Sequence, residues 1–165
     1  MPDRKRDLDM DSALLSFRLD DNVSHLLRRA HFRAENLFSS SLGDYGITPR
    51  QKALLVAAFQ HPGSTLNYLA EQIVLDRQTT AEMAHRLVAR GLLERRRSVR
   101  DGRAYAIWTT SEGSDLLHAV MPEDAAVEEQ ILAPLPEEYR PLFLQCLHLM
   151  VDQDQCSQTR DDSVG

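Results

Sequence analysis

The sequence lacks a hydrophobic segment long enough to cross a membrane. No apolar run in the chain approaches the roughly 18 residues that a spanning helix requires. Residues 1–7 carry charges, but no apolar stretch follows them, so we expect no secretory signal. The two cysteines, Cys146 and Cys156, are too few for a disulfide framework. These absences favour a cytoplasmic protein without a membrane partner.

Motifs for catalysis are missing as well. The sequence contains no phosphate-binding glycine-rich loop, no Gly-x-Ser-x-Gly motif and no His-Glu-x-x-His pattern. A metal site built from His25, His118 and an acid of the Asp20–Asp21 pair is conceivable. Single histidines on helices are, however, more often surface or core residues than ligands. We therefore predict a protein that is not an enzyme and holds no metal or cofactor.

Positive charge is scarce overall but concentrated in one stretch. The chain has 19 basic against 25 acidic residues, a formal net charge of −6. Between Arg77 and Arg103, however, eight arginines stand against three acidic residues, a net charge of +5. From Ser111 onward, twelve acidic residues stand against two arginines. This segregation indicates a surface that attracts a polyanion such as DNA on a protein that otherwise repels it.

The spacing of apolar residues predicts a mainly helical fold with one small β-hairpin. Thr48, Asp76 and Thr110 each stand directly before a helical pattern, where we expect their side chains to cap the helix. The nearly all-apolar stretch 53–59 indicates a buried helix. The predicted helices cover residues 23–42, 49–59, 65–73, 77–90, 110–132 and 137–154, and the predicted strands cover residues 92–97 and 105–109.

The middle of the chain has the element order of a helix–turn–helix followed by a wing. A short helix, a tight turn at Val74–Leu75 and the helix over 77–90 would place the second helix in a DNA major groove. Five arginines and two acids follow within residues 94–103, where the arginines could reach phosphates or a minor groove. The alternative is a solvated helix pair with a charged hairpin, but such a hairpin would usually mix lysine with glutamate. We therefore predict nucleic-acid binding.

Five short motifs follow one another in a fixed order: Gly46-Ile47-Thr48-Pro49-Arg50-Gln51, Leu66-x-x-Leu69-Ala70, Arg86-Leu87-Val88-x-x-Gly91-Leu92-Leu93-x-Arg95, Asp101-Gly102-Arg103 and Thr110-x-x-Gly113. In this ordered set, over residues 20–155, the chain resembles the MarR family of bacterial transcriptional regulators. The resemblance implies a palindromic double-stranded DNA operator, from which a small ligand or an oxidant releases an obligate homodimer. It also implies a single domain, and we expect dimerisation helices over 21–43 and 111–155, a winged helix–turn–helix over 47–110, a flexible arm over 1–20 and a flexible tail over 156–165.

The resemblance also assigns residues to the DNA contact. It places Gln78, Thr79 and Glu82 at base-facing positions, and Asp101 and Arg103 in the wing. The predicted DNA-binding set is Arg77, Gln78, Thr79, Glu82, Arg86, Arg97, Arg100, Asp101 and Arg103. Glu82 departs from the family pattern, in which Arg or Ser/Thr is common, and could accept a hydrogen bond from cytosine N4 or weaken binding. Thr109 also departs, since it replaces a common Leu, and we interpret it as a tolerated packing change.

Cationic side chains on the helix over 23–42 predict an anionic effector. The resemblance places an effector pocket between this helix, the next helix and the helix after the wing. Arginines above an aromatic-lined cavity would suit an aromatic carboxylate or its coenzyme A thioester. The alternative is that these cations are solvated or pair with the acidic C-terminal helices. The predicted ligand-binding residues are His25, Arg28, Arg29, His31 and Phe32.

Apolar residues on the terminal helices predict a homodimer, because a small winged helix cannot cover them alone. They are Leu26, Leu37, Phe38, Leu142, Phe143, Leu147 and Met150. Cys146 lies on the apolar stripe of the last helix, where we expect a core thiol, and Cys156 lies in the polar tail. We predict a repressor that a small organic ligand releases from DNA. The alternatives are a redox-sensing repressor that uses Cys146 or Cys156, and a winged-helix protein-interaction module.

Overall fold

The computed structural model describes residue 11, residues 14–97 and residues 105–158, of which the last seven are described by their backbone alone. The fold is mainly helical with a small antiparallel sheet, which confirms the predicted fold class. The elements in chain order are η1 (Leu19–Asp21), α2 (Val23–Leu42), η2 (Gly43–Tyr45), α3 (Pro49–Gln60), β1 (Ser64–Thr65), α4 (Leu66–Gln72), α5 (Arg77–Ala89), β2 (Leu93–Arg97), β3 (Tyr105–Thr109), α6 (Ser111–Leu132), η3 (Glu137–Tyr139) and α7 (Arg140–Gln158).

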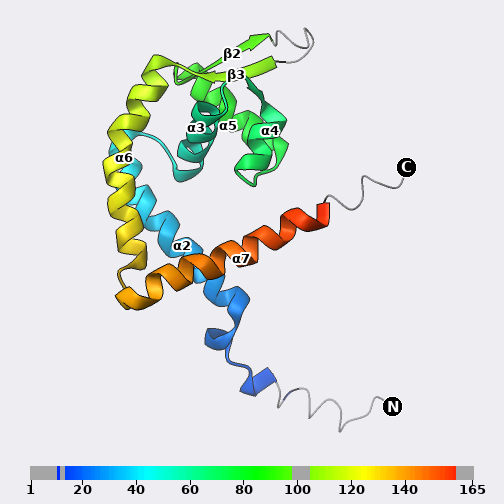
Figure 1. Ribbon diagram of the computed structural model, residues 1–165, viewed down its shortest axis with the longest axis vertical. Coiled ribbons are helices and arrows are strands. Elements are labelled where there is room, and N and C mark those ends of the chain that lie inside the picture. The colour runs from blue at the N-terminus through cyan, green and yellow to red at the C-terminus, as the bar shows by residue number, and fades with distance from the viewer. Residues whose placement is uncertain (1–10, 12–13, 98–104, 159–165) are drawn as a thin grey trace, which may run out of the picture.

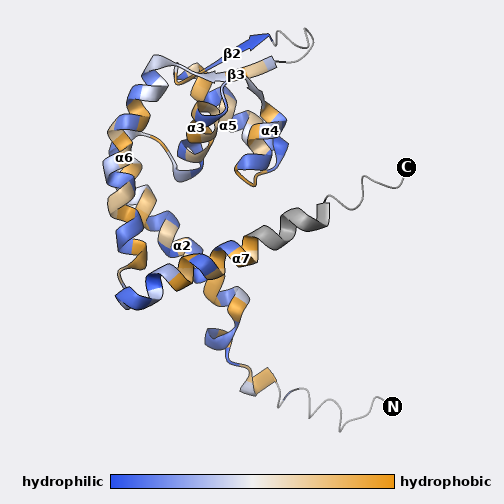
Figure 2. Ribbon diagram, in the orientation of Figure 1, coloured by the Kyte–Doolittle hydropathy of each residue, from blue (hydrophilic) through white to orange (hydrophobic). Residues whose placement is uncertain are grey.

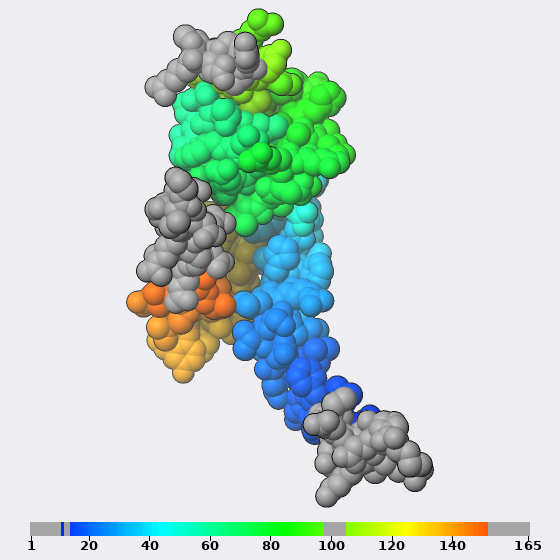
Figure 3. All heavy atoms as spheres, turned by 90° about the vertical axis from the view of Figure 1, so that its right-hand side faces the viewer, coloured from blue at the N-terminus to red at the C-terminus, as the bar shows by residue number. Residues whose placement is uncertain are grey.

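These elements form two regions that differ in shape (Figure 1). The first, which we call the head, contains α3, α4, α5 and the sheet, packed together at one end of the molecule. The second, which we call the frame, contains α2, α6 and α7. Helix α6 leaves the sheet and runs beside α2, and α7 follows α6 at the end away from the head. In the space-filling view, α7 and the first half of α2 project beyond the rounded head (Figure 3).

Side-chain caps start the helices where the sequence predicts them. The Thr48 hydroxyl accepts a hydrogen bond from the Gln51 N–H (3.2 Å), and the Gln51 amide oxygen accepts one from the Thr48 N–H (3.1 Å). Asp76 caps α5 and Thr110 caps α6. Each cap satisfies N–H groups that have no partner inside their helix. The helix boundaries in this part of the chain therefore follow from local sequence.

The sheet has the order β1-β3-β2, with both pairings antiparallel. The hairpin of β2 and β3 was predicted, whereas the two-residue strand β1 was not. β1 exists because the chain at Gly63 comes close to β3. The Gly63 N–H donates to the Ile107 carbonyl oxygen (3.0 Å), and a Cβ atom on Gly63 would lie 2.7 Å from the Trp108 ring. Two residues are too short to show an alternating pattern in the sequence.

The hydrophobic core lies in the head and at its junction with α2 and α6. Its fully buried side chains are Leu42, Leu54, Leu55, Leu69, Leu87, Leu93, Val120, Val127 and Thr80. Among the described residues, Thr80 is the one polar residue that is buried, and its hydroxyl donates a hydrogen bond to the Asp76 carbonyl oxygen (2.9 Å). The buried helix predicted over 53–59 is α3, but Phe59 is 49% exposed. The apolar run at its end therefore reaches the surface.

Both ends of the chain contain more helix than the sequence predicts. Residues 14–16 are helical and η1 follows, so the described part of the predicted flexible arm has regular structure. At the other end, η3 precedes α7, and α7 continues to Gln158 through Cys156. Polar composition indicated loops at both ends, but a polar sequence does not prevent a helix from continuing past its last apolar residue.

Helix α7 leaves its apolar side chains uncovered. None of the side chains of residues 140–151 is buried, and Figure 2 shows hydrophobic residues along this helix and at the start of α2. Cys146 is exposed, so the prediction of a core thiol is wrong for the single chain. Within the part of the chain that the structure describes, no helix is long and apolar enough to span a membrane.

Candidate nucleic-acid interface

The outer face of α5 presents polar and charged side chains. Thr80, Met83, Ala84 and Leu87 point into the core, and this inward stripe leaves the predicted contact residues Arg77, Gln78, Glu82 and Arg86 exposed on the opposite face. The Gln78 Nε2 lies 3.5 Å from the Glu82 Oε1, one helical turn away. The structure therefore brings four of the predicted DNA-binding residues onto one surface.

Thr79 differs from these neighbours because its hydroxyl is already engaged. Its side chain is half-buried, its hydroxyl donates to one Asp76 carboxylate oxygen (2.6 Å), and its N–H donates to the other (2.8 Å). The Thr79 hydroxyl, and next its N–H, hold the pKa of Asp76 below its ordinary value of 3.8. Thr79 therefore fixes the start of α5, and its half-buried side chain lies beside the exposed face of that helix.

The turn before α5 is tight and strained. Val74 adopts a left-handed backbone conformation (φ 53°) and is 86% exposed. The Leu75 N–H donates to the Ala70 carbonyl oxygen (3.0 Å), which ends α4. A β-branched residue with positive φ is rare, because its Cβ substituents crowd the backbone. The turn at Val74–Leu75 was predicted, but this conformation could not be predicted, since Gly or Asn usually occupies such a position.

The wing carries its arginines against aromatic rings. Arg95 and Tyr105 lie on one face of the hairpin, with the guanidinium carbon 3.8 Å from the ring centre. On the other face, Arg96 pairs with Glu94 and lies 5.4 Å from the centre of the Trp108 ring. Arg97 is exposed at the end of β2. Neither ring was predicted to contact an arginine, although the diagonal spacing of arginine and aromatic residues across a hairpin is a usable signal.

Three of the predicted wing residues, Arg100, Asp101 and Arg103, lie outside the described residues. Their contact with DNA therefore remains a prediction from the sequence. Strand β2 ends at Arg97 and strand β3 begins at Tyr105, on either side of these residues in the chain.

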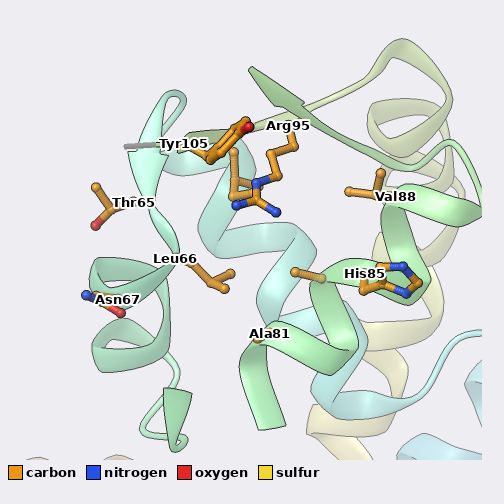
Figure 4. Close-up of a pocket in the computed structure, with 10 residues that line it drawn as sticks. Thr65, Leu66, Asn67, Ala81, His85, Val88, Arg95 and Tyr105 are labelled. Carbon is orange, nitrogen blue, oxygen red and sulfur yellow. The ribbon is translucent and has the colours of Figure 1, made fainter. Parts of the chain in front are cut away.

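A pocket of about 420 Å³ lies between α4, α5 and the sheet (Figure 4). Leu66, Val88 and Ile107 supply apolar lining, and Arg95 and His85 supply polar groups. Figure 4 shows the Arg95 guanidinium beside the Tyr105 ring at the edge of this pocket. The stacking therefore holds one wing arginine, Arg95, close to α5.

A second pocket, of about 410 Å³, lies where the head meets the frame. It is lined by α3, the end of α4 and α6, and among its residues are Lys52, His61, Met121 and Asp124. An effector pocket near this junction was predicted from the sequence, but none of these lining residues was named for it. The reason is that Lys52 and Asp124 stand 72 positions apart, so no sequence pattern pairs them.

The predicted ligand-binding residues on α2 lie elsewhere. Arg28, Arg29, His31 and Phe32 are exposed and His25 is half-buried, and none of the five lines a pocket described above. Arg29 pairs with Asp20 (2.9 Å), and the His31 imidazole lies 3.7 Å from Glu35. In the single chain, these side chains therefore belong to the solvated face of the helix. The conceivable metal site with His25 and His118 is not formed, since the described residues contain no group of three ligands suited to a metal ion.

Comparisons with known proteins point to one family. Residues 45–104 match the model of the MarR family. The chain is 31% identical over 134 residues to the transcriptional regulator HosA of Escherichia coli, covering 81% of this chain and 98% of HosA. Among solved structures, it is similar to BpsR of Bordetella bronchiseptica, whose DNA binding is regulated by 6-hydroxynicotinic acid (25% identity, TM-score 0.78, 82% of this chain and 97% of BpsR). It is also similar to the repressor CouR bound to a 23-mer DNA duplex (25% identity, TM-score 0.75, 81% and 94%).

Proposed function

Because the chain belongs to the MarR family of transcriptional regulators, we propose that it binds a palindromic operator as a homodimer and leaves it when a small organic acid binds. The family makes it a DNA-binding regulator and not an enzyme. The operator, the dimer and the ligand are the finer parts of this proposal. Each rests on a different feature of the molecule.

One observation carries the operator contact: the exposed row on α5 lies beside an arginine-rich wing. Gln78 and Glu82 offer an amide and a carboxylate, which are groups that read base edges, while Arg77 and Arg86 suit phosphates. Arg97 and the predicted wing-tip residues Arg100, Asp101 and Arg103 extend this surface toward a minor groove. A surface used only for protein contact has no reason to combine these groups with a net charge of +5.

The uncovered apolar face of the frame supports the homodimer. Leu142, Leu149 and Met150 on α7 and Leu26 on α2 are exposed in the single chain. Exposed apolar side chains on two helices are costly in water, and a second copy of the chain would cover them. Two heads on one frame would also match the two halves of a palindrome.

The ligand is proposed to be a small organic anion. BpsR, which is similar in fold and sequence, responds to 6-hydroxynicotinic acid, an aromatic acid. In this chain, the pocket at the junction of head and frame is lined by Met121 and by the ion pair of Lys52 and Asp124, so an anion would have to share the Lys52 ammonium with the Asp124 carboxylate. The cationic residues of α2, including Arg28, stand on the neighbouring helix and would favour the approach of an anion.

A mobility-shift assay against the DNA upstream of the protein's own gene tests the proposal, performed at two salt concentrations. We expect one fragment to be bound specifically, with an affinity that falls steeply as salt rises. Addition of 6-hydroxynicotinic acid and related aromatic acids should then release it. Equal affinity for all fragments would contradict operator binding and favour the protein-interaction alternative.

The exposed thiol of Cys146 supports a second candidate, a redox-controlled repressor. The thiol is accessible in the single chain, but it lies on the same side of α7 as Leu142 and Leu149, so oxidation would act on dissociated chains and keep them apart. Peroxide should then release the operator complex, and Cys146→Ser or Cys156→Ser should prevent this release. If organic acids release the complex and peroxide does not, the redox candidate is wrong.

A further inference from the structure

One side chain connects the three helices α2, α3 and α6 where the head meets the frame. Lys52 belongs to α3, its ammonium pairs with the Asp124 carboxylate of α6, and the same Nζ lies 4.5 Å from the centre of the Phe38 ring of α2. Figure 1 shows α2, α3 and α6 converging at this point. A change in any one of these contacts therefore changes how the head is held.

This ion pair is more deeply placed than the others that the structure describes. The Lys52 and Asp124 side chains are 17% and 19% exposed, whereas every other ion pair among the described residues has at least one side chain that is more than half exposed. Water therefore screens the attraction between Lys52 and Asp124 far less than that of a surface pair.

The choice of lysine at this position is unusual for the chain. The sequence contains seventeen arginines and two lysines, and the other lysine is Lys5. An ammonium is a compact charge that fits between an aromatic ring and a carboxylate, whereas the planar guanidinium needs more room and prefers to bind a carboxylate through two N–H groups. The site between Asp124 and Phe38 therefore suits lysine in particular.

We propose that Lys52 is a positioning residue for DNA binding, because its contacts with Asp124 and Phe38 set the angle between the head and the frame. A partly buried ion pair adds little net stability compared with apolar residues of the same volume, but it is directional. Its loss leaves the other charge without a partner and lets the helices adopt other angles. The main effect of the pair is thus on geometry.

This angle matters because of the proposed function, on which the inference rests. Two recognition helices must enter half-sites about one helical turn apart, so the heads of a dimer must be held at a defined separation. Other contacts near the joint connect fewer helices, and the Ser41 hydroxyl, for example, donates to the Glu123 carboxylate (3.5 Å) between α2 and α6 alone. The Tyr45 hydroxyl donates to the Ala119 carbonyl oxygen (3.1 Å), and Arg90 donates to the Gly46 carbonyl oxygen (2.5 Å). Neither of them joins α2, α3 and α6 together.

The test compares two variants of the pair with a matched control. Lys52→Met keeps the apolar stem and removes the charge, and Asp124→Asn keeps the shape of the partner. The control, Arg50→Gln, breaks the exposed pair between Arg50 and Glu35 (3.4 Å), which also joins α3 to α2. The DNA is a palindromic duplex selected by the wild-type protein from a random pool, together with versions that carry one or two extra base pairs between the half-sites.

We expect Lys52→Met and Asp124→Asn each to bind the selected duplex about tenfold more weakly. They should also lose the preference for the original half-site spacing, because a looser joint tolerates more separations. Binding to duplexes without the palindrome and self-association in sedimentation should stay unchanged. The Arg50→Gln control should remain within about twofold of the wild type.

Two results would overturn the positioning role. One is parent-like affinity and spacing preference in both Lys52→Met and Asp124→Asn. The other is an equal loss of binding to palindromic and non-palindromic DNA together with a lower melting temperature, which indicates only a structural role. The failure of the proposed function looks different, because the wild-type protein would then select no palindrome at all.

Discussion

The head and the frame differ in how far they bury their apolar side chains within the single chain. In the head, Leu54, Leu55, Leu69 and Leu87 are fully buried against one another within the same chain. In the frame, the described part of α7 has no buried side chain, although every turn of it carries apolar residues. The core of the head also includes Leu42, Leu117 and Val120 of the frame, whereas the described apolar side chains of α7 all stay at least partly exposed. The charges are separated as well, since the basic helix α5 and strand β2 lie in the head, whereas twelve acidic residues stand against two arginines from Ser111 onward.

Charges on the exposed face of the frame should produce the largest effect. Leu142→Asp combined with Leu149→Asp places two carboxylates where we propose that a second copy packs. We expect the dimer to dissociate at micromolar concentration and affinity for the operator to fall by a factor of about 100 or more, equal to about 2.7 kcal/mol. Sedimentation measures the first effect and a mobility shift the second. His148→Glu, at an exposed position on another side of α7, is the control, and a double variant that remains dimeric would refute the assigned surface.

Loss of a wing arginine should weaken the head's DNA contact without affecting the frame. Arg103→Ala is expected to cost about 1–3 kcal/mol of operator binding and to reduce the salt dependence by about one charge per subunit. Arg18→Ala removes an arginine of the same charge next to the frame, where it pairs with Asp21 (3.3 Å). This control should leave both quantities unchanged. Equal losses in the two variants would mean that overall charge, and not the wing, determines the affinity.

Gln78→Ala should alter which sequences the head prefers more than how tightly it binds. A base-edge contact contributes to discrimination, by about 1–3 kcal/mol for a good pair, and adds little to non-specific binding. Competition between the selected operator and duplexes changed at single base pairs measures this preference. The companion variant Glu82→Gln removes a negative charge from the same face and should strengthen non-specific binding. If Gln78→Ala weakens binding to all sequences alike, its role is not base recognition.

Two adjacent threonines at the junction of the regions should have opposite effects on stability. Among the described residues, the Thr109 hydroxyl is buried without a hydrogen-bond partner, so Thr109→Val should stabilise the protein by about 1 kcal/mol. The Thr110 hydroxyl accepts from the Gly113 N–H (3.0 Å) and donates to the Gly91 carbonyl oxygen (2.6 Å). Thr110→Val should therefore destabilise it by about 1 kcal/mol. Thermal unfolding at one protein concentration compares them, and changes of the same sign would contradict the assignment.

The smallest expected effect concerns acid sensitivity at the start of the recognition helix. Hydrogen bonds from Thr79 lower the pKa of Asp76, so the ionised form is favoured in the folded protein. This contribution is fully present above the ordinary value of 3.8 and is lost as pH falls through the lower folded value. Asp76→Asn should thus lose less stability than the wild type between about pH 7 and about pH 3. Parallel pH profiles for the two proteins would show that Asp76 makes no such contribution.

Much of the candidate interface was predictable because a helical repeat places residues on faces. The inward positions Thr80, Met83 and Leu87 follow from spacing alone, and the outward positions Gln78 and Glu82 follow as their complement. What spacing could not show is that the Thr79 hydroxyl is engaged by Asp76, or that Tyr105 stacks on Arg95. Both contacts depend on rotamers and on the approach of neighbouring segments.

Local interactions and long-range contacts thus account for different parts of this protein. Capping side chains, apolar periodicity and the clustering of arginines act over a few neighbouring residues, so the sequence alone specifies the helices, the hairpin and the basic surface. The pairing of Lys52 with Asp124, the strand at Ser64–Thr65 and the exposure of Cys146 join or separate residues far apart in the chain. Only the packing of whole helices decides these features, because the energy of each contact exists only after the segments have met.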